Sequence, residues 1–557
     1  MSASSHSTYD VCLQSLSANL TADEQQTQML RCISNTIDET RSGVDAFYLI
    51  YAASLVFFMQ AGFAMVCAGS VRLKNLQNTM LKNLLDACGA ALGFYTVGYA
   101  FAWGSTDPGA NGNDGTNDQL TFAGLSNFFL SDLDRKAFWL FQFSFAATSA
   151  TIVAGALAER SQMLAYLLYS TMLTAFVYPI VVHSIWTDAG FLSSFTANPL
   201  LGIGVIDYAG SLVVHVTGGQ TALIAAYVLG ARKGRFNEVD GRRIVRDFPG
   251  HSIALKMLGV FILWFGWYGF NAGSVYYITI KSNSVLAQNA LVNTTLSAAA
   301  GCISALLAKA WLSERITGEA TFSLTDALWG CLSGLVSVTG GCAVMRSWSS
   351  IVVGLISGLI YLWGSSVLVK LRVDDAVDAI PIHLCSGVWG ALSVGLFAVP
   401  EYLQLLHPGV TAAGWFYNVN DGRLLACQVI GVLFVIGWVT VLMLPFFGLL
   451  HYLGWLRADG LDEIVGLDIS YHGSSMPVDY NTADDNGSHD QYVAEHRQRR
   501  QQQREENQKR GTLRRRMLFL DLSSSKSDHR RPTRQQDGGG NIIGIEEAAT
   551  DMFYSEN

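Results

Sequence analysis

Apolar runs long enough to cross a membrane fill most of the chain, from about residue 44 to residue 456. A spanning helix needs roughly 20 mostly apolar residues. Of the 557 residues, 50% are hydrophobic and only 14% are charged, whereas soluble domains carry about 25% charged residues. The sequence therefore predicts an all-α polytopic membrane protein.

Eleven such runs can be counted by length and apolar content. Very short turns around Glu159 and Met345 separate two neighbouring pairs, so the count depends most on these two places. The predicted spans lie near residues 44–70, 78–103, 136–158, 162–187, 207–230, 252–272, 285–312, 325–343, 348–370, 380–400 and 424–454.

Lysine and arginine gather in alternate loops between these runs, and such loops face the cytosol. The loop at residues 231–251 holds six of them, whereas residues 107–119 and 187–206 hold none. We therefore expect the N-terminus outside the membrane and the C-terminus in the cytosol.

Residues 1–43 are polar and lack the basic start and apolar core of a cleavable signal. We expect them to form an extracytoplasmic tail, with the first apolar run acting as the targeting signal. There Asn19, in Asn19-Leu20-Thr21, would be an accessible glycosylation acceptor. Cys12 and Cys32 could pair with each other, pair between subunits, or remain free thiols.

Residues 457–478 and 479–557 follow the last apolar run. The second of these stretches is dense in Gln, Arg, Glu, Ser and Gly. Because it cannot bury a core, we expect a disordered cytosolic tail.

Two histidines stand eight residues after an aspartate in different halves of the chain: Asp207 precedes His215, and Asp375 precedes His383. Ionisable residues are costly inside a bilayer and mark substrate paths by default. A matched pair is typical of a duplicated carrier or channel, here with runs one to five related to runs six to ten as an inverted repeat. A packing histidine, a haem held by histidines that include His183, and a zinc site are the alternatives.

Aromatic residues accompany these histidines at residues 141–145, at Trp186 and at residues 264–274. Aromatic faces beside a short polar side chain can bind a small cation by cation–π attraction. Trp186 alone would also suit an anchor at the membrane interface.

Several blocks stand in order within residues 44–475: Gly69-Ser70-Val71-Arg72-Leu73-Lys74-Asn75, Gly155-Ala156-Leu157-Ala158-Glu159-Arg160, Trp267-Tyr268-Gly269-Phe270-Asn271-Ala272-Gly273-Ser274, and those that join Asp207 to His215 and Asp374 to His383. These blocks resemble the Amt/Mep/Rh ammonium transporter superfamily, most closely its plant and algal Amt-type members. The resemblance implies a homotrimer in the plasma membrane with a pore in each subunit.

By this resemblance, Trp186, Phe145 and Ser274 would form an outer site that recruits ammonium over water. The carboxylate of Asp207 would help to attract the cation and would also cap nearby backbone groups. Phe145 and Phe270 would form a stacked gate beneath the recruitment site.

The resemblance also makes His215 and His383 the lining of a hydrophobic conduction path, with Gln142 beside the gate and Asp375 in a structural role. Moving an intact cation past phenyl rings carries a heavy desolvation cost. Ammonium can lose a proton and cross as ammonia, and neutral imidazoles can accept or relay that proton. We therefore expect ammonia and the proton to cross separately.

Two positions depart from the family pattern and leave the helix packing near the histidines open. Leu384-Cys385-Ser386-Gly387 stands where many relatives have Gly-Gly-Cys-Gly, and Thr217 replaces a small apolar residue or glycine.

The segment from Gly466 to Gly473 resembles the family's cytosolic motif, by which one subunit's tail touches its neighbour's pore. We therefore expect residues 457–478 to form a cytosolic regulatory motif. Ser470 stands where plant-type members place a phosphorylatable threonine, and a phosphate adds about −1.5 to −2 charge. A kinase or regulatory protein is therefore an expected partner, against the alternative of an unmodified structural serine.

Ammonium or ammonia and the lipid bilayer are the other predicted partners. The sequence has no nucleophile–base set, phosphate loop or metal cluster, so we expect no enzyme, cofactor, metal or nucleic-acid partner. Two other functions stay open: passive ammonia conduction as in Rh proteins, which generally lack the tryptophan found here at Trp186, and an ammonium sensor that signals through its tail.

Overall fold

The computed structural model describes residues 12, 21–105, 120–131, 133–239 and 242–473, and seven positions between 494 and 505. It divides into two units, Met1–Asp484 and Asp485–Asn557. In the second unit, Arg499 pairs with Glu495 one helical turn earlier, at 2.9 Å. Most of the predicted disordered tail, 479–557, lies outside the described residues, and the fold below is that of the first unit.

Helices dominate the first unit. The α-helices are α2 (Ala22–Ser70), α3 (Leu76–Gly93), α4 (Tyr99–Trp103), α5 (Lys136–Ala156), α6 (Met163–Met172), α7 (Tyr178–Trp186), α8 (Thr217–Leu229), α9 (Ile253–Gly273), α10 (Lys281–Thr317), α11 (Leu324–Thr339), α12 (Ser347–Lys370), α13 (Ser386–Phe397), α14 (Pro400–Leu406), α15 (Arg423–Tyr452), α16 (Gly460–Val465) and α17 (Leu467–His472).

Shorter elements connect or extend these helices. An antiparallel hairpin pairs β1 (Phe236–Val239) with β2 (Arg242–Val245). Short 3₁₀ turns lie at Leu73–Asn75, Phe128–Leu130 and Leu200–Gly202. Single π-helical turns lie at Phe94–Gly98, Leu173–Val177, Ser211–Val216 and Ile380–Cys385.

Within the described ranges, ten helical stretches are long and apolar enough to cross a bilayer. Some combine α-helical and π-helical parts, such as Met163–Trp186, which contains α6 and α7. The eighth predicted span corresponds to α11, an apolar helix of only 16 residues. The all-α membrane fold is confirmed, whereas the count of eleven spans stays a prediction.

The first helix begins well before the first predicted span. Thr21 and Glu24 form a capping box, in which each side chain accepts a hydrogen bond from the other residue's backbone N–H. The helix then runs for 49 residues to Ser70. Residues 22–43 are therefore helical and continuous with the first span, and a disulfide joins Cys32 to Cys12.

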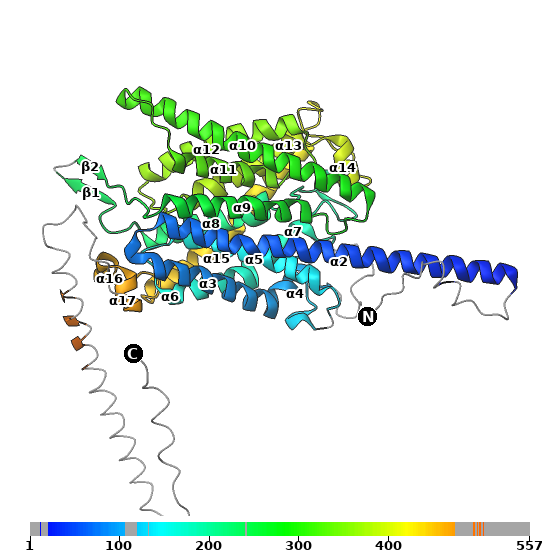
Figure 1. Cartoon of the computed structure of the whole chain (residues 1–557), viewed down its shortest axis with the longest axis horizontal. Coiled ribbons are helices and arrows are strands. Elements are labelled where there is room, and N and C mark those ends of the chain that lie inside the picture. The colour runs from blue at the N-terminus through cyan, green and yellow to red at the C-terminus, as the bar shows by residue number, and fades with distance from the viewer. Residues whose placement is uncertain are drawn as a thin grey trace, which may run out of the picture. The chain divides into compact units, whose positions relative to one another are not determined.

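The long helices lie side by side, and the N-terminal part of α2 extends past the others (Figure 1). Small residues let such helices approach closely. A Cβ on Gly301 of α10 or on Gly330 of α11 would lie 2.4 Å from the carbonyl oxygen of the other glycine. Only glycine fits at this crossing.

One end of the bundle carries the hairpin, α16 and α17, and is called here the tail end (Figure 1). The backbone N–H of Gln162, just before α6, donates to the carbonyl of Leu456 near this end. Because α6 and α7 form one continuous stretch, Trp186 at the end of α7 lies toward the opposite end, called here the far end.

Candidate functional site

Two phenyl rings lie face to face inside the bundle. Phe145 of α5 and Phe270 of α9 have centroids 3.9 Å apart and ring planes 18° apart. Trp186 stands edge-on to Phe145 at 6.0 Å, and its indole N–H donates to the carbonyl of Asp207 at 2.6 Å. Ser274, just past α9, donates its hydroxyl to the carbonyl of Phe270 at 2.9 Å. The structure thus gathers the predicted recruitment and gate residues around one ring pair.

The two histidines meet directly. The Nδ1 atoms of His215 and His383 are 3.1 Å apart, and the rings are buried, 0% and 4% exposed. His215 also stacks on Trp267 at 5.2 Å and lies 5.7 Å from Phe270. The histidines therefore continue the aromatic column, and two nitrogens that face each other at hydrogen-bond distance require one donor and one acceptor.

An aspartate caps the π-helical turn that carries each histidine. The Oδ2 atom of Asp207 accepts from the backbone N–H of Leu212 and of Val213, at 2.9 and 2.8 Å. The Oδ2 atom of Asp375 accepts from the backbone N–H of Ile380 at 2.7 Å. Carboxylates stabilise the exposed N–H groups at a helix start. This shared geometry explains the matched eight-residue spacing.

Gln142 lies on α5, one turn before Phe145, and is 1% exposed. Its Nε2 atom donates to the hydroxyl of Tyr276 at 3.1 Å. Its Oε1 atom has no hydrogen-bond partner among the described residues.

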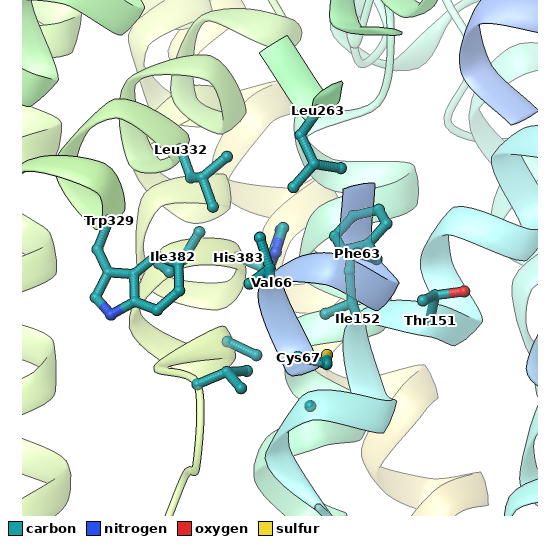
Figure 2. A pocket seen from close by; sticks show the side chains of 13 residues that line it. Phe63, Val66, Cys67, Thr151, Ile152, Leu263, Trp329, Leu332, Ile382 and His383 are labelled. Carbon is teal, nitrogen blue, oxygen red and sulfur yellow. The ribbon is translucent and has the colours of Figure 1, made fainter. Parts of the chain in front are cut away.

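A small cavity adjoins His383, and Figure 2 shows the side chains that line it. Phe63 of α2, Leu263 of α9 and Trp329 of α11 form much of its wall. The hydroxyl of Thr151, another lining residue, donates within the protein, to Gln60 at 2.7 Å and to its own helix. The cavity offers few partners to an ion.

A buried ion cluster holds the tail end together. Arg72 pairs with Glu159 at 2.6 Å, and Arg232 pairs with Asp374 at 2.8 Å and with Glu159 at 3.3 Å. Burial alone would raise the pKa of Glu159, but Arg232 and Arg72 lower it to about 2. The pKa of Asp374 likewise lies well below its usual value despite burial, because it is hydrogen-bonded to Arg232.

This ion cluster was not predicted from the sequence. In the sequence, Glu159 marked a short turn between two spans and also stood, like Arg72 and Asp374, in the family-like blocks. Arg72 and Arg232 were loop charges. Their position at span ends in a chain with so few charges was the available signal. Trp267, which stacks on His215, was quoted in a block without a role.

The short helix α17 rests on the start of α3. The carboxylate of Asp468 accepts from the backbone N–H of Gln77 and of Asn78, at 2.9 and 2.8 Å. The backbone N–H of Leu467 donates to the Asn75 side chain at 2.9 Å. Ser470 is fully buried in this contact. The predicted regulatory segment is therefore docked against the bundle.

Three other positions were singled out in the sequence: His183, Thr217 and Asn19. Both ring nitrogens of His183 are occupied, by the Ala102 carbonyl at 3.0 Å and the Thr121 hydroxyl at 2.9 Å, so His183 does not join the histidine pair. Thr217 is buried. Asn19 lies outside the described residues. Within the described residues, no group of three or more His, Cys, Asp or Glu side chains could hold a metal ion.

Comparisons with known proteins agree on one family. A family model described as "Ammonium Transporter Family" matches residues 46–476. "Ammonium transporter 3" of Dictyostelium discoideum is 37% identical over 436 residues, which cover 78% of this chain and 94% of that protein. "Ammonium transporter 1 member 3" of Oryza sativa subsp. japonica is 39% identical over 479 residues, or 84% and 93% of the two chains.

Solved structures show the same relationship. A structure named "Sensor Amt Protein" aligns with a TM-score of 0.66 and 30% identity over 78% of this chain and 99% of that chain. The structure of Candida albicans Mep2 aligns with a TM-score of 0.62 and 25% identity, over 74% and 86% of the two chains. The protein therefore belongs to the ammonium transporter family.

Proposed function

We propose that this transporter recruits ammonium at the far end of the bundle, removes a proton from it, and conducts ammonia past the two histidines. One observation carries the proposal. Phe145, Phe270, His215 and His383 form a continuous buried column of rings that ends in an apolar cavity.

Recruitment would take place above the phenyl pair, where Trp186 and Ser274 stand beside Phe145 and Phe270. Aromatic faces attract a cation within about 6 Å of the ring centroid. The Ser274 hydroxyl, which already donates to a carbonyl, keeps its lone pairs for an N–H donor. Asp207 is 4% exposed and contributes negative potential while its oxygens cap the backbone.

The column itself favours a neutral molecule. Ammonium would lose its hydration shell between the rings without an acidic side chain to replace it. Loss of a proton lets ammonia pass. The Nδ1–Nδ1 hydrogen bond joins the two imidazoles into one unit, and Nε2 of His215 has no hydrogen-bond partner among the described residues. A proton can be relayed along such a pair.

The tail end would face the cytosol and the N-terminus the outside of the plasma membrane, in keeping with the arginine-rich loop at residues 231–251. We propose a homotrimer with a pore in each subunit. The docked α17 would be the regulatory element, and a kinase or regulatory protein acting on Ser470 would release it.

A second function has some support. A related solved structure is named "Sensor Amt Protein", so signalling by an ammonium-loaded pore is the alternative for this chain. Passive gas conduction is less well supported, because the Trp186 ring beside Phe145 at the far end can bind a cation by cation–π attraction.

The test uses the full chain in two hosts. In a yeast strain that lacks its own ammonium carriers, expression is expected to restore growth on low ammonium. In voltage-clamped oocytes, ammonium is expected to evoke an inward current that potassium does not evoke. Growth without current would favour gas conduction, and ammonium binding without growth or current would favour a sensor.

A further inference from the structure

Tyr276 lies just beyond the end of α9, two residues after Ser274, in a backbone conformation that few residues other than glycine adopt. Its φ is 59°. Such conformations persist where the surroundings hold them, and they gather at functional sites. The contacts of the Tyr276 side chain therefore indicate why this conformation is kept.

The ring of Tyr276 is wedged against α5. It stands edge-on to Phe138 at 5.1 Å and to Phe141 at 5.9 Å. Phe141 in turn contacts Phe145, the phenyl ring of the proposed gate, at 4.7 Å. The wedge fixes the tyrosine hydroxyl within hydrogen-bond distance of Gln142.

The hydroxyl of Tyr276 accepts from Nε2 of Gln142, so the other end of the amide, Oε1, is turned elsewhere. That oxygen belongs to a side chain that is 1% exposed, and it has no partner among the described residues. A buried acceptor without a partner is costly unless a ligand or water satisfies it. Gln142 and Phe145 are three residues apart on α5, so their side chains are neighbours on the helix surface.

We propose that Oε1 of Gln142 accepts an N–H of ammonium at the gate, and that Tyr276 is the positioning residue that keeps the amide in this orientation. With the tyrosine hydroxyl removed, the amide can turn and present Nε2, whose hydrogens repel a cation. The proposal rests on the proposed function and names a specific acceptor for its substrate.

The test compares Tyr276→Phe with Tyr277→Phe in voltage-clamped oocytes, at equal surface amounts of protein. Both changes remove one hydroxyl and keep the ring. The hydroxyl of Tyr277 accepts from Arg135 at 2.7 Å, whereas Gln142 donates to Tyr276, so Tyr277→Phe is the matched control. Tyr276→Phe is expected to raise the half-saturating ammonium concentration about three- to tenfold, the value of one hydrogen bond. The maximal current should stay within about twofold, and Tyr277→Phe should match the wild type.

A double-mutant cycle separates positioning from simple loss of structure. Gln142→Leu is expected to raise the half-saturating ammonium concentration by the same factor as Tyr276→Phe. The double variant Tyr276→Phe/Gln142→Leu is expected to raise it no further. If Gln142→Leu fails to reach the surface, Gln142→Glu replaces it and is expected to lower the half-saturating concentration. The proposal would be overturned if Tyr276→Phe behaved like the wild type or lost only maximal current. It would also be overturned if the effects of Tyr276→Phe and Gln142→Leu on the half-saturating concentration were additive in the double variant. Absence of ammonium current in the wild type would instead overturn the proposed function.

Discussion

The contact between α17 and α3 leads to a quantitative prediction for Ser470. Its side chain is 0% exposed, and its Oγ atom has no hydrogen-bond partner among the described residues. Two hydrogen bonds to the Asp468 carboxylate and one from Leu467 hold the helix. Charged hydrogen bonds contribute about 1.5–3 kcal/mol and neutral ones about 1 kcal/mol, so docking is worth about 4–7 kcal/mol.

Ser470→Asp would place a carboxylate without a partner in this contact. The cost of such a buried charge is several kcal/mol, on the order of 4 kcal/mol, which offsets most of the docking energy. That change shifts the docking equilibrium about a thousandfold. Ser470→Ala removes only a hydroxyl that makes no hydrogen bond to the described residues, so it is the matched control and should leave docking unchanged.

Hydrogen exchange measured by mass spectrometry reports the docking directly. The backbone amides of residues 466–473 are expected to exchange much faster in Ser470→Asp than in the wild type or in Ser470→Ala. Ammonium currents of the same proteins are expected to fall only in Ser470→Asp. Unchanged protection in Ser470→Asp would refute the argument from burial, and faster exchange with normal current would show that docking does not control the pore.

Three further predictions concern the ion cluster, the recruitment site and the cavity. Glu159→Gln removes a buried carboxylate whose pKa is lowered from 4.5 to about 2, a shift equivalent to about 3 kcal/mol. We expect this variant to have a lower melting temperature in detergent than the wild type. The difference should be the same between pH 5 and 8, because the stabilisation is lost only as the pH falls from about 4.5 to about 2. Trp186→Leu is expected to raise the half-saturating ammonium concentration severalfold in oocytes while leaving the melting temperature near that of the wild type. Gly155→Val would add a side chain where even a Cβ would lie 2.3 Å from the Val377 side chain, so surface fluorescence of a tagged variant should fall sharply.

The sequence predicted the all-α membrane fold because apolar length is a local property. Helix α5, for example, ends at Ala156, close to the predicted boundary at 158. The aspartate–histidine spacing was also visible, since each aspartate caps the turn that follows it within a few residues.

Contacts between distant segments could not be predicted in this way. Arg232 pairs with Asp374 across 142 positions, and Asp468 reaches the start of α3 across 390 positions. Only the packing of the helices brings these groups together. The orientation of the Gln142 amide could not be predicted from the sequence either, because it depends on where the Tyr276 hydroxyl lies.

The most direct test of the account is the current carried by His383→Ala beside that of the wild type, with ammonium and potassium applied in turn to the same oocytes. The two imidazoles are in contact at 3.1 Å, so removing one breaks the relay and widens the column. We predict a severe loss of ammonium current, an entry of potassium, or both. Ammonium current and potassium exclusion equal to those of the wild type would contradict the claim that the histidine pair separates the proton from ammonia.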